Sequence, residues 1–295
     1  MKVTSLNEAE HRPRRVAVGS FDGVHLGHRA VIGDADTVLT FNPHPLEVLA
    51  PERAPKLLTS YRRREELIAA LGVEELIEIP FDRSFAKQSP QEFIDHVLDQ
   101  GIGASEVRVG ENFRFGAGAT GDTALLGEQA AFETVVVPLL EVDGTVVSSS
   151  EIRGLVSRGE VDRAAELLGS RFELSGTVER GEARGRELGY PTANIAPDPR
   201  HCLPARGVYA AMAVLDDGER HPAAVSIGVR PTFDSALGEL VEAYLIDFDG
   251  DLYGRGLSLE FVRHLRPEAE FDDAEALIQQ MSRDVQDARA LLAEG

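Results

Sequence analysis

The sequence contains very little cysteine and lysine, and these shortages exclude several kinds of site. Its single cysteine, Cys202, excludes an internal disulfide and a zinc site built from several cysteines, so we expect a buried, unreactive thiol. The three lysines are Lys2, Lys56 and Lys87, and none stands in a G-x-x-x-x-G-K-[ST] string. A Walker-type phosphate loop is therefore excluded, so any bound nucleotide must be held by backbone N–H groups, histidine, arginine and a metal ion.

Long apolar runs and basic charge are also scarce. No apolar run reaches the roughly 18 residues that a membrane span needs, and the opening string MKVTSLNEAEHRPRR lacks the apolar segment of a signal peptide. We therefore expect a cytoplasmic protein with no membrane partner. The 30 basic residues face 50 acidic ones, and the net charge of −20 argues against nucleic acid as a partner. A small anionic ligand in a local pocket stays compatible with this charge.

The 295 residues, of which 43% are hydrophobic, suffice for two domains with separate cores. The first half alternates short β-branched runs with helical patterns, such as YRRREELIAALG and SPQEFIDHVLDQG, the second with Ser89 as N-cap, Pro90 at N1 and Glu92 at N3. This alternation predicts a parallel sheet covered by helices, with ligands beyond the carboxyl ends of the strands. The strands are expected at residues 15–21, 37–41, 76–80, 106–110 and 134–140.

From about Arg171 the sequence changes to strands joined by tight turns. Asp217-Gly218 and Asp249-Gly250 each lie between two apolar runs and predict hairpins, so an antiparallel barrel is expected. A final helix is predicted to begin at an Asp272 cap, with Glu275 three residues on. We place the boundary between the two domains, residues 1–168 and 169–295, near Gly169.

Two histidines follow the first predicted strand in the string GSFDGVHLGHRAVI, residues 19–32. His25 and His28 fall at the start of a helix that is expected to begin near Gly27. Unpaired N–H groups and the positive end of the helix dipole favour a phosphate there, and two imidazoles can donate further hydrogen bonds. Taken alone, the string also fits exposed histidines that hydrogen-bond to backbone carbonyls. A zinc site is weaker, because no nearby cysteine supplies the two missing ligands.

The string G-x-F-D-G-x-H-x-G-H resembles the signature of the nucleotidyltransferases related to class I aminoacyl-tRNA synthetases. The second phosphate-binding motif of that superfamily, I-S-S-T-x-I-R, is matched by VSSSEIR, residues 147–153, with Ser150 in place of threonine. The resemblance implies that Arg153 stabilises the departing pyrophosphate together with His25 and His28. The ATP-binding residues that it implies are Gly19, Phe21, Asp22, Gly23, His25, Gly27, His28, Ser149 and Arg153.

Two internal strings narrow the family. TFNPHP, residues 40–45, and VGENFRFG, residues 109–116, look like motifs of the bacterial bifunctional riboflavin kinase/FMN adenylyltransferases, also called FAD synthetases. The resemblance implies that Asn112 lies in the adenylyl-transfer site and that Phe113 and Phe115 lie near the flavin, although the two phenylalanines taken alone favour a core position over a ligand contact. Only RAVIGDA separates His28 from the next strand, fewer residues than the family usually has, so a first helix of barely two turns is expected.

The second half resembles the riboflavin kinase signature. GEARGRELGYPTAN, residues 181–194, is similar to G-x-x-x-G-R-x-L-G-[FY]-P-T-A-N, and GVRPTF, FDGDLYG and LRPEAEF are similar to its partner motifs. Thr192 and Asn194 would offer neutral oxygens to a Mg²⁺ ion that also holds ATP phosphates. The resemblance places ATP or flavin at Gly181, Gly185, Arg186, Gly189, Pro191 and Arg230.

Glu242 is singled out by its surroundings in LVEAYLI, where the neighbours on both strand faces are apolar. A carboxylate is costly there unless it is paired or used, and partial burial would raise its pKa toward that of a general base. The matching glutamate of the family takes the proton from the substrate hydroxyl. A glutamate at the barrel end that reaches solvent or an arginine remains the alternative.

Together the resemblances imply an α/β nucleotidyltransferase domain with a Rossmann-like parallel sheet, followed by an antiparallel β-barrel riboflavin kinase domain with a C-terminal helix. The substrates would be riboflavin, FMN and ATP, with Mg²⁺, and weak self-association is left open. One alternative is a chain whose kinase alone is active. Another is a flavin-binding module without turnover, although Thr192, Asn194 and Glu242 would then have no use.

Overall fold

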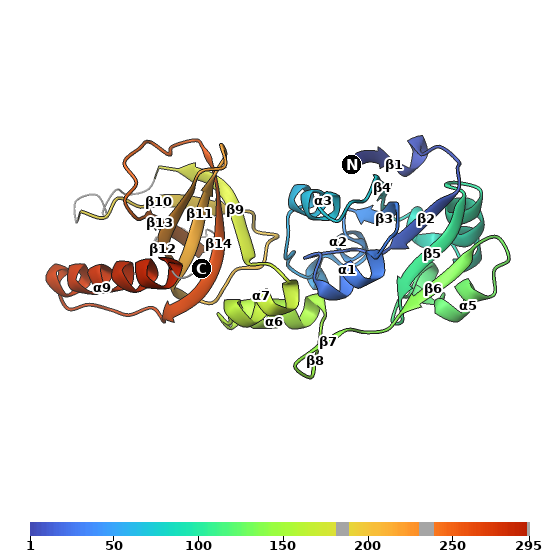
Figure 1. The fold of residues 1–295 in the computed structure, drawn as a ribbon. Helices are drawn as coiled ribbons and strands as arrows, with labels where there is room; N and C mark the ends of the chain where they lie inside the picture. The colour runs from blue at the N-terminus through green and yellow to red at the C-terminus, as the bar shows by residue number, and fades with distance from the viewer. Residues whose placement is uncertain (181–188, 230–238, 294–295) are drawn as a thin grey trace. The chain divides into compact units, whose positions relative to one another are not determined.

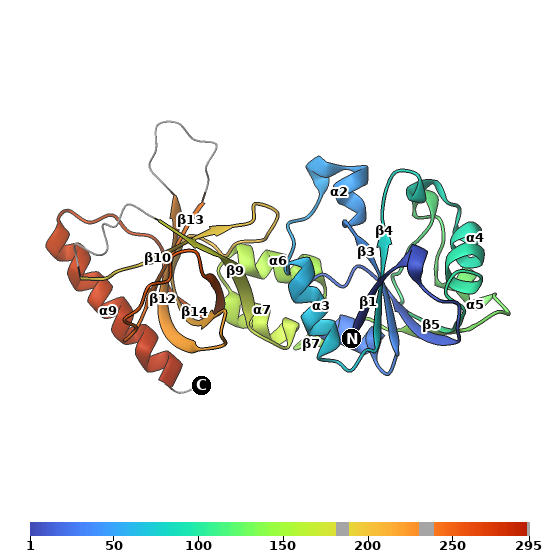
Figure 2. The same ribbon diagram turned by 90° about the horizontal axis from the view of Figure 1, so that it is seen from above.

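The computed structural model describes residues 1–180, 189–229 and 239–293, which divide into two compact units, Met1–Ser149 and Ser150–Gly295 (Figures 1 and 2). This division falls after the first residue of helix α6 (Ser149–Ser157) and before α7 (Val161–Leu168), whereas the sequence-based boundary lies after both helices. Helix α7 packs against strands of the second unit, which explains the difference. No helix in these described ranges combines the length and the apolar character needed to cross a bilayer.

The first unit is built on one parallel sheet of six strands in the order β1-β4-β3-β2-β5-β6. Its parallel strands confirm the architecture predicted from the alternating sequence. A two-residue pair of strands follows, β7 (Glu141–Val142) with β8 (Thr145–Val146). The sheet strands are β1 (Lys2–Ser5), β2 (Arg14–Val18), β3 (Thr37–Asn42), β4 (Glu75–Pro80), β5 (Ala104–Gly110) and β6 (Glu133–Val137).

Apolar side chains cover both faces of this sheet, so its strands are buried as parallel strands usually are. On one face, Ala17 and Val38 pack with Ile32 and Ile68 of two helices. On the other, the strands pack against the segment that carries Phe93. The helices are α1 (Leu26–Ile32), α2 (Pro45–Leu49), α3 (Tyr61–Ala69), α4 (Pro90–Glu92) with the π-helical Phe93–Asp99, α5 (Thr123–Gly127), and short 3-10 turns at Leu6–Glu8, Pro51–Arg53, Phe85–Lys87 and Ala117–Ala119.

Most predicted elements of this unit are present. The Ser89 capping box is confirmed, since Ser89 and Glu92 exchange backbone-to-side-chain hydrogen bonds. The first strand ends earlier than predicted, because β2 ends at Val18 and a non-helical loop follows. Strand β1 was not predicted: it is only four residues long and pairs with β4 at the edge of the sheet.

The second unit contains a closed antiparallel barrel in the order β10-β13-β12-β11-β14-β9, which confirms the predicted barrel. Alternate residues of its strands point inward, so Val241, Ala243 and Leu245 are buried. The strands are β9 (Phe172–Glu179), β10 (Ala193–Pro197), β11 (Gly207–Leu215), β12 (Arg220–Val229), β13 (Glu239–Leu245) and β14 (Gly256–Arg266).

Of the two predicted hairpins, only the first is present. Asp217-Gly218 joins β11 to β12, which pair antiparallel. The hairpin predicted at Asp249-Gly250 is wrong, because β13 pairs with β10 and β12, whereas β14 pairs with β11 and β9. Residues 246–255, the 246–255 connection below, instead run across one end of the barrel, and Gly254 N–H donates to the Val178 carbonyl of β9 at 2.9 Å.

Helix α9 (Ala274–Ala293) closes the described chain and lies along the outside of the barrel (Figure 1). Ala288 packs against Ala210 and Ala224 of two barrel strands. The cap is Asp273 rather than the predicted Asp272, since Asp273 Oδ1 accepts the N–H of Ala276 at 2.8 Å. The helix therefore begins one residue later than the pattern of charges indicated.

Candidate active sites

The loop after β2 adopts unusual backbone angles that place its histidines. Phe21 and Val24 have φ values of 52° and 41°, a region that residues with a side chain seldom adopt, and Gly23 has φ 87°. The loop is held at its start, where Gly19 N–H donates to the Leu39 carbonyl at 3.2 Å. A Cβ at Gly19 would lie 3.1 Å from the Phe21 ring, so glycine leaves room for that ring.

The two histidines stack on each other at the start of α1. Their ring centroids are 3.5 Å apart with 15° between the planes, and His25 is 5% exposed. His25 is the N-cap, because its Nδ1 accepts the N–H of His28 at 3.2 Å. In neutral His25 the ring proton therefore sits on Nε2. The expectation of unpaired N–H groups needs this correction, since the N–H of His28 is bound to His25. The short first helix is confirmed at seven residues.

Asp22 attaches the histidine loop to the segment that contains Leu58 and Thr59. Its carboxylate, 5% exposed, accepts the backbone N–H groups of Leu58 at 2.9 Å and Thr59 at 3.2 Å. Gly23 N–H in turn donates to the Thr59 hydroxyl at 3.1 Å. The sequence interpretation made Asp22 an ATP-binding residue, and the geometry gives its carboxylate a holding role. Ser149 contributes to the same loop, since its hydroxyl donates to the Asp22 carbonyl at 3.0 Å. Arg153 belongs to the second compact unit.

Asn112, Phe113 and Phe115 follow β5 at the carboxyl end of the sheet. Phe115 is 6% exposed and contacts Phe93 with ring centroids 5.5 Å apart, so it lies in the core. Phe113 is partly exposed and stacks on Phe115, with ring centroids 5.6 Å apart. These rings end a continuous series of contacts through Phe41, Phe81, Phe85, Phe93, Phe115 and Phe113. Phe113 is therefore the more exposed of the two rings.

In the second unit, Glu242 lies beside the residues expected to bind a metal. The hydroxyl of Thr192 donates to Glu242 Oε1 at 3.3 Å, and Asn194, 8% exposed, stands directly opposite Glu242 in the β10–β13 ladder. Glu242 is half-buried, and its strand neighbours Val241 and Ala243 are fully buried. A hydroxyl, an amide and a carboxylate are hard oxygen donors that suit Mg²⁺ when nucleotide phosphates complete its shell.

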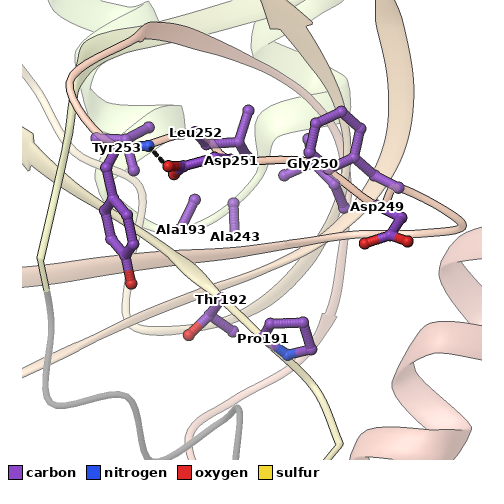
Figure 3. A pocket seen from close by; sticks show the side chains of 12 residues that line it. Pro191, Thr192, Ala193, Ala243, Asp249, Gly250, Asp251, Leu252 and Tyr253 are labelled. Atoms are coloured by element: carbon purple, nitrogen blue, oxygen red, sulfur yellow. Dashed lines mark hydrogen bonds between the residues drawn. The ribbon is translucent and has the colours of Figure 1, made fainter.

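Beside this pair lies a pocket of about 650 Å³ (Figure 3). Pro191 and Thr192 from the predicted signature meet the 246–255 connection there, and Ala193 faces Ala243 across the β10–β13 ladder. Six residues of the FDGDLYG string, 248–253, line the pocket. The lining residues are Val178, Pro191, Thr192, Ala193, Ala243, Leu245, Phe248, Asp249, Gly250, Asp251, Leu252 and Tyr253.

Several predicted kinase residues fall outside the part of the chain that the structure describes, namely Gly181, Gly185, Arg186 and Arg230. Gly189 is described and has φ 85°, a conformation that glycine adopts without strain. The pocket residues Phe248 and Tyr253 were missed because the Asp249-Gly250 string was interpreted as a hairpin tip. The length of the connection was the signal against a tight hairpin, since ten residues separate β13 from β14.

Comparison with known proteins gives both units a family. A protein-family model described as FAD synthetase matches residues 7–151, and one described as Riboflavin kinase matches residues 168–292. Together these matches define a two-domain transferase of flavin chemistry. A Pseudomonas fluorescens protein named bifunctional riboflavin kinase/FMN adenylyltransferase is 36% identical over 96% of this chain and 94% of its own length. The chain belongs to the family of bifunctional riboflavin kinase/FMN adenylyltransferases.

Other relatives agree in length and fold. A Listeria monocytogenes protein with the same name is 36% identical over 95% of this chain and 92% of its own length. A crystal structure from Streptococcus pneumoniae, of a protein named a macrolide-efflux protein, superposes with a TM-score of 0.88. It is 30% identical and the match covers 98% of this chain and 99% of that one. The sheet unit and the barrel unit therefore both have counterparts in that structure.

Proposed function

We propose that the two units divide the work of a bifunctional riboflavin kinase and FMN adenylyltransferase, the enzyme that the family membership defines. The barrel unit would phosphorylate riboflavin with ATP to give FMN. The sheet unit would then join FMN to AMP from a second ATP, giving FAD and pyrophosphate. The matches over both halves support two activities rather than the kinase alone.

The hydrogen bond between Thr192 and Glu242 carries the kinase half of the proposal. This bond joins a half-buried carboxylate to the Thr192 hydroxyl beside a pocket, and Asn194 stands opposite Glu242 in the ladder, which supports the assignment. Glu242 would accept the proton of the ribityl 5′-hydroxyl as that oxygen bonds to the γ-phosphorus of ATP and the bond to the bridging oxygen of ADP breaks. Positioning and charge neutralisation supply most of the remaining rate.

Thr192 and Asn194 would hold Mg²⁺ together with the ATP phosphates, and the ion would neutralise charge on the transferred group. The glycines and arginines of the signature that lie outside the described residues stay assigned to ATP or flavin by resemblance. Among the pocket residues, the alanine pair Ala193 and Ala243 leaves space for a flat ring, because neither side chain extends beyond Cβ.

In the sheet unit, a phosphate oxygen of FMN would attack the α-phosphorus of ATP while the bond to pyrophosphate breaks. His25 and His28 would donate to the phosphates, and the resemblance assigns the departing charge to Arg153, which belongs to the second compact unit. Asn112 and Phe113 would lie near the FMN. The stack of His25 and His28 supports this assignment, because it gathers both imidazoles at the start of α1, where His25 Nδ1 accepts a backbone N–H.

Three coarser expectations belong to the same proposal. We keep residues 1–168 and 169–295 as the limits of the two activities, with α6 and α7 on the adenylyltransferase side. We keep the cytoplasm as the location, since one buried cysteine suits a reducing compartment. Weak self-association stays part of the proposal and is testable by ultracentrifugation.

The test is a time course of flavins by HPLC after mixing the protein with riboflavin, ATP and Mg²⁺. FMN should rise first and FAD should follow. Glu242→Gln should lower FMN formation at least a hundredfold while added FMN is still converted to FAD. Glu239→Gln, an exposed position on the same strand, is the matched control and should change neither rate more than twofold. Accumulation of FMN without FAD, or a fully active Glu242→Gln variant, would contradict the assignment.

A further inference from the structure

A buried arginine lies at the carboxyl ends of the sheet strands without a place in the mechanism above. Arg64 comes from helix α3 and its side chain is 4% exposed. Its Nη1 donates to the Ser20 carbonyl at 3.1 Å and to the Phe41 carbonyl at 3.3 Å, and its Nη2 donates to Glu78 Oε1 at 3.1 Å. Burial lowers the pKa of Arg64, and the charge of Glu78 opposes that change. Burying a charge is costly, and these three hydrogen bonds offset the cost only in this one geometry.

The carbonyls that Arg64 binds belong to the two motifs of the adenylyltransferase site. Ser20 lies in the histidine loop, and its carbonyl accepts a second hydrogen bond from the Thr40 hydroxyl at 3.3 Å. Phe41 lies in TFNPHP, and the next residue, Asn42, donates to the other oxygen of Glu78 at 3.1 Å. One guanidinium therefore joins the ends of β2, β3 and β4.

From Ser20 the contacts continue to the histidines. Phe21 follows directly, with its positive φ, and its ring meets the edge of His28 with centroids 5.3 Å apart. His28 stacks on His25. A strained residue keeps its conformation only where its surroundings fix it, and the doubly bound carbonyl of Ser20 is the fixed point immediately before Phe21.

We propose that Arg64 is a positioning residue for adenylyl transfer, which holds the histidine loop in the conformation that presents His25 and His28 to ATP. Lysine is not equivalent here, because its three donors sit on one nitrogen, whereas Arg64 uses Nη1 for the two carbonyls and Nη2 for Glu78. The proposal rests on the phosphate-binding role given above to the histidines.

The molecule offers a matched control at the opposite end of the same sheet. Arg14 is 1% exposed and, like Arg64, joins backbone carbonyls to a carboxylate. It donates to the carbonyls of Glu10 and Ile102 and to Glu75 Oε2, the last at 3.1 Å. Arg14 begins β2, whereas the histidine loop follows the end of that strand. Replacing Arg14 tests the general cost of losing a buried arginine in this unit.

The experiment compares Arg64→Lys with Arg14→Lys in the full chain, at a temperature well below the melting point of either variant. For FMN adenylylation, Arg64→Lys should lower kcat at least tenfold and raise KM for ATP. Arg14→Lys should leave both constants within twofold while lowering the melting temperature to a similar extent. Riboflavin phosphorylation by the same samples should be unchanged. Glu78→Gln, which keeps the size of the partner, should lower adenylylation in the same direction and serves if Arg64→Lys does not fold.

Equal losses of adenylylation in Arg64→Lys and Arg14→Lys would overturn the proposal, as would a parallel loss of kinase activity. Normal adenylylation in both single variants, Glu78→Gln and Arg64→Lys, would also overturn it. A His25→Gln variant separates this outcome from failure of the site assignment. If His25→Gln adenylylates FMN normally, the assigned role of the histidines is wrong. If His25→Gln is inactive and Arg64→Lys is normal, only the positioning role is wrong.

Discussion

At the residue scale, the histidine loop depends on close approaches that only small side chains allow. A Cβ at Gly27 would lie 3.3 Å from Nδ1 and Cε1 of the His25 ring and 3.5 Å from the Val147 carbonyl. The ring and the glycine therefore share one tight space. His25 caps the helix through Nδ1, so a displaced ring changes both the cap and the position of Nε2.

Gly27→Ala is expected to shift the His25 ring by a few tenths of an ångström. Because a misplacement of about 1 Å can cost roughly a hundredfold in rate, we expect kcat/KM for adenylylation to fall about tenfold. Steady-state rates with FMN and ATP measure this, with riboflavin phosphorylation unchanged. Gly127→Ala is the control in the same unit, since its Cβ would meet no atom within 4 Å. An unchanged Gly27→Ala rate would show that the ring position is not critical.

At the element scale, helix α9 is fastened to the barrel by a bidentate ion pair. Arg266, at the end of β14, donates to Asp284 through Nε at 2.9 Å and Nη2 at 2.7 Å. Asp284 is 5% exposed and also accepts from Gln280 at 2.8 Å. The Arg266 guanidinium lies over the Phe271 ring at 5.7 Å. The pair therefore fixes the LRPEAEF segment between β14 and the helix.

Asp284→Ala should lower the free energy of unfolding by about 3 kcal/mol, because it leaves the Arg266 charge partly buried without its partner. Urea denaturation followed by circular dichroism measures the change. Asp287→Ala, three residues further along the same helix and exposed, should change stability by less than about 0.5 kcal/mol. Similar losses in both variants would mean that the ion pair adds nothing beyond helix propensity.

Elements were predictable where a local pattern determines them. The Ser89 box and the Asp217-Gly218 hairpin depend on residues within one turn, and both are present. Asp249-Gly250 has the same local pattern, but the pairing of β13 and β14 is decided by barrel closure, which involves all six strands. Local turn chemistry cannot report which strands become neighbours. Strand β1 was missed because a four-residue run has too few residues for a period to be recognised.

The candidate sites were predicted to a different depth. Motif strings identified His25 and Thr192, and the apolar surroundings in LVEAYLI identified Glu242; the structure brings Thr192 and Glu242 within 3.3 Å of each other. The role of Asp22 was not predictable, because its partners lie 36 and 37 residues further along the chain. Arg64 did leave a signal, since it stands four residues before Ile68 on the buried face of α3.

At the scale of the whole molecule, each unit has its own apolar core. The free energy of unfolding of the second unit is expected to fall at alkaline pH, because Tyr209 is buried in it. This residue is fully buried on β11, and its hydroxyl donates to the Ala205 carbonyl at 2.5 Å. Burial raises the pKa of Tyr209 to about 12. The ordinary value in an unfolded chain is about 10, so folding favours the protonated phenol.

Because the pKa of Tyr209 is higher in the folded than in the unfolded chain, the stability it contributes falls as the pH rises. The contribution of Tyr209 is complete below about pH 10 and is lost between about pH 10 and pH 12, at up to roughly 1.4 kcal/mol per pH unit. Tyr209→Phe should be about 1 kcal/mol less stable near neutral pH, since the Ala205 carbonyl loses its donor. Its stability should then decline less steeply with alkali. Urea midpoints measured from pH 8 to 12 test this, and identical slopes for the two proteins would refute the assignment.

The two units differ in how their sheets end. The barrel is closed and has no edge strand, whereas the parallel sheet ends at β1 and β6. Strand β1 covers β4, whose Leu76, Ile77 and Ile79 are fully buried. Edge strands with unpaired backbone groups template intermolecular pairing, and short strands carrying lysine, as β1 does with Lys2, limit it. Deleting the first five residues would therefore expose β4 as an aggregation-prone edge strand. These residues protect the sheet from intermolecular strand pairing.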